Sequence, residues 1–130
     1  MAKREKRVLL YQFPTEYLMP AQEVFRAHHI RVQVLEKTAW REKIGFLLGY
    51  KGYCPADGNT KESFYFPYEV VLFEHIQGNR LTKVLASLEA VGIPRIIYKS
   101  VITPYNTLWT LRYLCEHMQR EHGAGTYTAK

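Results

Sequence analysis

Four side chains in the C-terminal third of the sequence have types and a spacing that suit ligand binding: Lys99, Thr103, Asn106 and Trp109. Lys99 follows an apolar run that predicts a strand, and Thr103-Pro104 is a typical start of a helix. A cation at a strand end, beside the free N–H groups of a helix N-terminus, can hold an anion. Thr103 and Asn106 would add hydroxyl and amide contacts, and Trp109 would form an apolar wall.

A structural interpretation of the same four residues stays open. Thr103 and Asn106 would then cap the helix, and Trp109 would pack on the sheet. Lys99 would pair with a carboxylate or extend its ammonium group to solvent. A third use of these residues is a protein–protein surface.

The first half of the sequence contains a partial echo of this pattern. Lys37 and Thr38 follow an apolar run, as Lys99 and Ser100 follow the later one. If the two halves are copies of one unit, both lysines lie near a pseudo-twofold axis and border one polar cleft. Lys37 and Thr38 are therefore secondary candidates for the ligand site.

The sequence predicts no metal site, no cofactor and no catalytic residue. It has neither the Cys-x-x-Cys nor the His-Glu-x-x-His spacing that metal sites use, and no glycine-rich phosphate loop. Cys54 and Cys115 are too few for a disulfide framework, and no spacing places a base beside either thiol. An enzyme with a site centred on Lys99 stays an alternative, because catalytic residues need not be adjacent in sequence.

The elements that must position these residues occur in two series. In the first half, apolar patterns predict a strand over 8–13, a helix over 15–28 and a strand over 30–35. A short helix over 40–48 follows. Glycine and proline in the connection 50–67 indicate a long loop that carries the aromatic run 64–68.

The second half repeats this plan. A strand is predicted over 70–76, an amphipathic helix over 81–91 and a strand over 93–98. A long helix then begins at Thr103-Pro104 and ends near Gly123. The halves superpose without a gap at an offset of 63 residues, which is typical of an internal duplication or simply of two βαβ units.

The predicted fold class is α/β, with two similar βαβ halves in one small layered domain. The strands are either all parallel or arranged as a ferredoxin-like α+β sandwich with an extra C-terminal helix. The predicted organisation is a basic flexible tail, one domain made of two halves and a connecting loop, and a loose C-terminal tail: 1–7, 8–122 (8–49, 50–67 and 68–122) and 123–130.

The net charge of +6 argues for a folded domain with mixed surface charge rather than a nucleic-acid-binding protein. Half of the excess lies in residues 1–7, so weak nucleic-acid binding through this tail is one alternative function. No apolar run approaches the 18 residues of a membrane span, and residues 1–7 precede no signal-peptide core. The sequence therefore predicts a cytoplasmic protein with no membrane partner.

The segment from Lys99 onward resembles an uncharacterised bacterial family, "domain of unknown function thirty-seven eighty-three". The resemblance covers about residues 69–122, and it departs from the family at Ser100, where alanine is commoner. It implies no activity, substrate or cofactor. The matching positions are Lys99, Val101, Thr103, Pro104, Asn106, Trp109, Leu111, Leu114, Glu121 and His122.

Together these features predict a non-catalytic cytosolic module that binds a small anionic ligand or a protein partner. A homodimer is one arrangement that the sequence leaves open.

Overall fold

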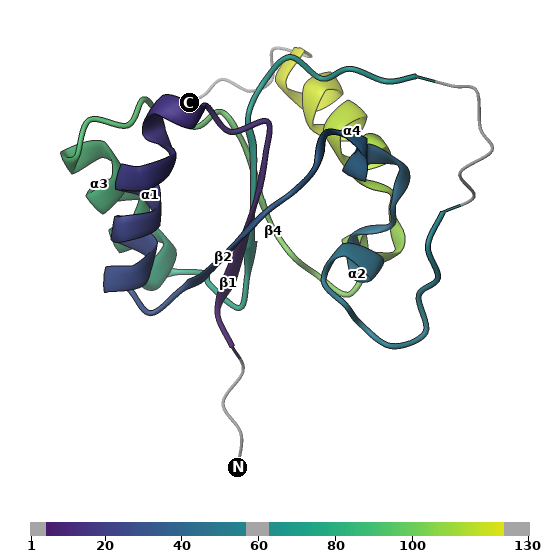
Figure 1. Cartoon of the computed structure of the whole chain (residues 1–130), viewed down its shortest axis with the longest axis horizontal. Coiled ribbons are helices and arrows are strands. Elements are labelled where there is room, and N and C mark those ends of the chain that lie inside the picture. Colours follow the sequence, from purple (N-terminus) through teal and green to yellow (C-terminus); the bar gives the residue numbers. More distant parts are fainter. Residues whose placement is uncertain (1–4, 57–62, 124–130) are drawn as a thin grey trace. The chain divides into compact units, whose positions relative to one another are not determined.

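The computed structural model describes residues 5–56 and 63–123 (Figure 1). The chain forms two compact units. The first unit contains Met1–Leu35 and Pro67–Ile102, and the second contains Glu36–Phe66 and Thr103–Lys130. Of the predicted tails and connection, residues 1–4, 57–62 and 124–130 lie outside the described residues.

The first unit contains a four-stranded sheet in the order β2-β1-β3-β4. Strands β1 and β2 are parallel, β3 and β4 are parallel, and β1 and β3 are antiparallel. The alternating α/β class is therefore confirmed, but the sheet is neither all parallel nor ferredoxin-like. Each crossover helix makes its own pair of strands parallel. The strands are Arg7–Tyr11 (β1), Arg31–Val34 (β2), Val70–Glu74 (β3) and Tyr98–Val101 (β4).

Helices α1 (Thr15–Ala27) and α3 (Asn79–Ala90) lie side by side on one face of this sheet (Figure 1). Their apolar faces, spaced three and four residues apart, pack on alternate residues of the strands. Pro20 lies inside α1, further along the helix than the first turn in which proline is best tolerated. The core includes Val8, Leu10, Phe25, Val71, Phe73, Val84 and Leu88, each less than 9% exposed.

The two βαβ halves of the first unit correspond at the offset of 63 residues at several points. Leu9 pairs with Leu72 at the centre of the antiparallel β1·β3 ladder, so the offset relates each strand to the other about this pair. Left-handed backbone occurs at Gln12 and at His75, and again at His29 and Gly92 after the helices. These features fit a duplicated unit, although the duplication itself stays a prediction.

The turns after α1 and α3 make one stability prediction. His29 and Gly92 both have a left-handed backbone, with φ of 61° and 90°, which favours glycine. We expect Gly92→Ala to lower the free energy of unfolding by about 1 kcal/mol and His29→Gly to raise it by about 0.5 kcal/mol. Urea denaturation measures both. The same sign for the two variants would contradict this account of the turns.

The predicted strand over 93–98 is wrong, because β4 begins only at Tyr98. Ile93 instead donates its N–H to the Leu88 carbonyl, just as Ile30 donates to Phe25 after α1. In the first half the strand begins directly after this turn. In the second half the strand register lies four residues later, and these extra residues form a loop. Buried Ile93 and Ile96 give the loop the apolar pattern of a strand.

The second unit contains short helices and one long helix. The predicted helix over 40–48 is two pieces, a 3₁₀ helix η1 (Lys37–Arg41) and α2 (Ile44–Leu47). A second 3₁₀ helix, η2 (Asn106–Leu108), precedes α4 (Leu111–Gly123). From the long connection, Phe64 contacts the ring of Trp40 and Phe66 is buried.

The predicted start of the long helix at Thr103-Pro104 is wrong. The chain leaves η2 in extended conformation at Trp109, and Thr110 forms a bridge with Lys43. The Thr110 hydroxyl then accepts a hydrogen bond of 3.0 Å from the Tyr113 N–H, which is the contact of an N-cap residue. Thr110, rather than Thr103, therefore caps α4.

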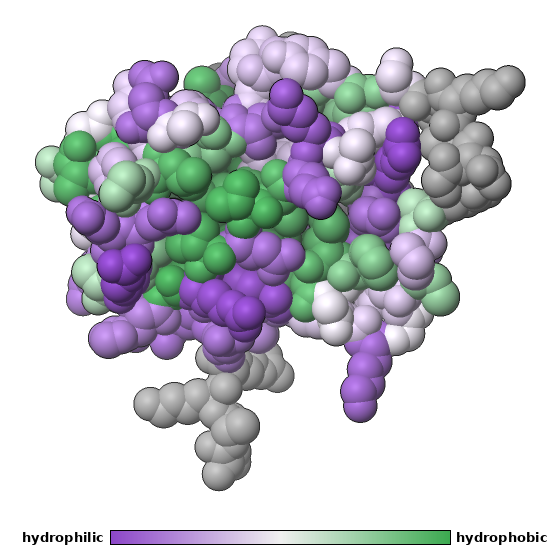
Figure 2. Space-filling model, in the orientation of Figure 1, coloured by the Kyte–Doolittle hydropathy of each residue, from purple (hydrophilic) through white to green (hydrophobic). Residues whose placement is uncertain are grey.

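Two surface features complete the description. None of the described helices has the length and apolar character needed to cross a membrane. In the region of α1, apolar residues (green) reach the surface beside hydrophilic ones (purple) in Figure 2. The exposed hydrophobic side chains of the first unit include Met19 on α1 and Val34 on β2.

Candidate functional site

Lys99 is the sequence candidate that lies in the first unit, and it occupies an unusual position in β4. It pairs with Val71, whose side chain belongs to the core between the sheet and the helices. Paired residues of neighbouring strands point to the same face of a sheet, so Lys99 faces α1 and α3. The corresponding residue of the first half is Val32, which pairs with Val8. A lysine therefore stands where the other half has a core-facing valine.

The ammonium group of Lys99 is held close to the sheet. Its Nζ donates a hydrogen bond of 2.8 Å to the carbonyl oxygen of Ile96. Burial and then the nearby positive charge of Arg95 lower the pKa of Lys99 from its usual value of 10.5. The hydrogen bond to a carbonyl oxygen favours the protonated amine, so Lys99 presents a positive charge at neutral pH.

Lys99 lines a pocket with a volume of about 250 Å³. The pocket lies where the last turns of α3 meet the loop 93–96 and the first residues of β4. Four apolar side chains and Pro94 supply most of its wall, and three charged side chains border it. Its lining residues are Leu85, Leu88, Glu89, Ile93, Pro94, Arg95, Ile96 and Lys99.

The three charged groups of the pocket have no protein counter-ion in the described part of the chain. Glu89 and Arg95 are exposed and Lys99 is half-buried, and none of them forms an ion pair with another described residue. Two cations that converge without an anion repel each other, as the lowered pKa of Lys99 indicates. An acidic group bound between Lys99 and Arg95 would relieve this repulsion.

The loop that forms the pocket exists in only one of the two similar halves. The four residues added before β4 bring Arg95 and the Ile96 carbonyl next to Lys99. The first half passes from His29 directly into β2 and has a valine at the position of Lys99. The pocket is thus a local addition to a repeated scaffold, which is how binding loops are commonly built.

Thr103 and Asn106 lie in the second unit and contact each other. The Thr103 N–H donates to Asn106 Oδ1 at 2.9 Å, and the Asn106 N–H donates to Thr103 Oγ1 at 3.1 Å. This reciprocal pair closes the turn before η2 and leaves Asn106 buried. A ligand site that joins these residues to Lys99 stays a prediction.

The other sequence candidates also lie in the second unit. The Trp109 ring makes edge contacts with Tyr113 and His117 of α4, with centroids 4.8 and 5.2 Å apart. Lys37 and Thr38 are exposed residues of η1 rather than strand-end residues. By strand register the counterpart of Lys99 is Val32, so the proposed equivalence of Lys37 and Lys99 is wrong.

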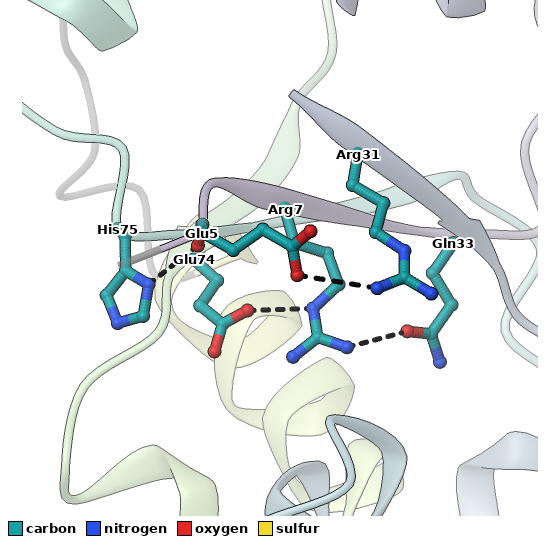
Figure 3. Close-up of polar contacts among 6 residues, drawn as sticks. All are labelled: Glu5, Arg7, Arg31, Gln33, Glu74 and His75. Atoms are coloured by element: carbon teal, nitrogen blue, oxygen red, sulfur yellow. Dashed lines mark hydrogen bonds and ion pairs between the residues drawn. The ribbon is translucent and has the colours of Figure 1, made fainter. Parts of the chain in front are cut away.

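Sequence reasoning missed a buried ion pair on the opposite face of the sheet (Figure 3). Arg7 Nε lies 2.8 Å from Glu74 Oε1, and Arg7 Nη1 donates to Gln33 Oε1 at 3.2 Å. The offset of 63 residues places Val70 and Tyr11 at the other end of the two strands, so the charges occupy one end only. β1 begins at Arg7, the last residue of the predicted tail.

More exposed contacts surround this pair (Figure 3). Arg31 lies 3.4 Å from Glu5, and both side chains are more than half exposed. The His75 ring nitrogen Nδ1 is 2.8 Å from the Glu5 carbonyl oxygen. These contacts hold the segment before β1 beside β2 and the end of β3, so they act in stability.

Residues 69–124 match the model of a family described as a domain of unknown function (DUF3783). The resemblance expected from the sequence is therefore confirmed. The matched segment contains β3, α3, β4 and α4, and thus every residue that lines the pocket. No curated protein and no solved structure matches this chain.

Proposed function

We propose that this chain is a non-catalytic, cytosolic ligand-binding protein, whose first unit binds a small organic anion in the pocket between α3 and β4. One observation carries the proposal. Lys99 stands at a core-facing position of the sheet, and its half-buried ammonium group borders a cavity without a carboxylate partner among the described residues.

The chemistry of the wall favours an organic anion over an inorganic one. Lys99 and Arg95 supply charge and hydrogen-bond donors for an acidic group. Leu85, Leu88 and Ile93 would contact an apolar body, and burial of that body adds to affinity in proportion to its area. Because one water occupies about 30 Å³ of liquid, the pocket volume corresponds to a ligand of about eight non-hydrogen atoms.

The pocket supports binding rather than reaction at Lys99. A nucleophilic lysine must lose its proton to an adjacent base. The Lys99 ammonium instead donates to the Ile96 carbonyl oxygen, which cannot take the proton. Lys99 therefore acts as a fixed positive charge.

Calorimetric titration with 4-methylpentanoate, acetate and phosphate at pH 7 tests the proposal. We expect 4-methylpentanoate to bind with a Kd of roughly 1 mM, and acetate and phosphate to bind more weakly, since they lack the apolar body. Lys99→Met keeps the length of the side chain but removes its charge, and should weaken 4-methylpentanoate binding at least tenfold.

Lys83→Met is the matched control, since Lys83 is an exposed residue of α3 outside the pocket. Its binding should equal that of the original chain. The proposal fails if none of the three anions binds, or if Lys99→Met binds 4-methylpentanoate as well as Lys83→Met does. Thermal unfolding of each variant confirms that the comparison is between folded proteins.

A further inference from the structure

We infer that the ligand of this pocket carries an ammonium group as well as its acidic group, and that it is a small aliphatic α-amino acid. The inference rests on the proposed function and names the class of its ligand. It starts from the third charged side chain of the pocket, Glu89, which a simple anion would leave without a counter-ion.

Glu89 makes one side of the pocket suitable for a positive group. It lies in the last turn of α3, which ends at Ala90, and its side chain forms no ion pair with another described residue. The carbonyl groups at a helix C-terminus carry negative partial charge. Both the carboxylate of Glu89 and the end of α3 therefore favour a cation at this position.

Lys99 and Arg95 give the pocket its positive charge, from β4 and from the loop that precedes it. The lining thus combines two cations with one carboxylate around an apolar wall. The complementary ligand has a carboxylate for Lys99 and Arg95, an ammonium group for Glu89, and an apolar side chain for Leu85 and Leu88. An aliphatic α-amino acid has these three parts on a single carbon atom.

The volume of the pocket selects a member of this class for testing. About 250 Å³ holds a side chain the size of leucine. L-Leucine is also 4-methylpentanoate with an added amino group, so the two compounds differ only in the group that Glu89 would bind. The corresponding amine, 3-methylbutylamine, lacks only the carboxylate of leucine.

Calorimetric titration of the full chain with these three compounds at pH 7 tests the inference. We expect L-leucine to bind at least fivefold more tightly than 4-methylpentanoate, and 3-methylbutylamine to show no measurable binding. Glu89→Gln should remove the preference for leucine and leave the affinity for 4-methylpentanoate unchanged. Glu23→Gln, at an exposed position of α1 outside the pocket, is the control and should keep the preference.

The outcomes separate the inference from the proposed function. If 4-methylpentanoate binds in a Lys99-dependent way but leucine binds no better, the inference is overturned and the proposed function stands. A preference for leucine that survives Glu89→Gln also overturns the inference. If neither compound binds, the proposed function fails, and the inference fails with it.

Discussion

Arg7→Met is expected to lower the free energy of unfolding by about 3 kcal/mol. The Glu74 side chain is only 4% exposed, and it accepts a hydrogen bond of 2.8 Å from the guanidinium of Arg7. Removal of one member of a buried ion pair leaves the other charge in a poorly solvated position. The double variant Arg7→Met/Glu74→Leu removes both charges and should recover most of the loss. Urea denaturation followed by circular dichroism measures these values.

Arg31→Met is the matched control for this prediction. Arg31 pairs with Glu5, but their side chains are 65% and 61% exposed. Exposed ion pairs contribute little, so the change in free energy of unfolding should stay below about 0.5 kcal/mol. If Arg7→Met had as small an effect as Arg31→Met, Arg7 would be energetically part of a solvated tail, as its neighbours in the sequence suggest.

The affinity of the pocket for 4-methylpentanoate is expected to fall as the pH rises in the alkaline range. Burial and the charge of Arg95 lower the pKa of Lys99 below 10.5, so this ammonium loses its proton before ordinary lysines do. The anion binds the charged form. Above the Lys99 pKa, the Kd should therefore rise by up to tenfold per pH unit. Titrations at a series of pH values measure this dependence.

The ligand-free chain should show the opposite sign in its stability. The unfolded chain holds the Lys99 proton more tightly than the folded chain does, so the contribution of Lys99 to the free energy of unfolding rises with pH between the lowered pKa and 10.5. Lys99→Met should lack both effects. An equal pH dependence of binding in Lys99→Met would assign the titration to another group.

Local patterns predicted most elements of the first unit. The apolar runs of β1 and β3 and the helical spacing of α1 and α3 are properties of neighbouring residues, and the structure confirms these elements within a few positions. β4 was misplaced because Ile93 and Ile96 are buried in a loop, and burial makes a loop as apolar as a strand. Strand order and direction depend on contacts between distant residues, which no local pattern contains.

The pocket was only partly predictable. Lys99 is common to the sequence-based site and to the pocket, but its partners differ. Thr103 and Asn106 satisfy each other in a turn, whereas Arg95 and Glu89 come from the loop and from the end of α3. The equivalence of Lys99 and Val32 requires a gap of four residues between the halves, and the gap-free alignment hides it.

The buried ion pair shows a different limit of the sequence. Arg7 follows Lys3, Arg4 and Lys6, so it reads as part of a basic tail. Its partner Glu74 is 67 positions away and is reached only through the antiparallel pairing of β1 with β3. The number of charged residues in the sequence is the same in either case, and only the pairing of the strands distinguishes them.

The protonation of Lys99 itself tests the central claim most directly. In protein labelled with ¹³C at the lysine side chains, the Cε signal of Lys99, assigned by its loss in Lys99→Met, reports the pKa of the amine by NMR. We expect a pKa below that of the other lysines without ligand, and an upward shift of this pKa when 4-methylpentanoate is bound. A Lys99 signal that titrates with the exposed lysines, and does not respond to saturating 4-methylpentanoate, would contradict the account.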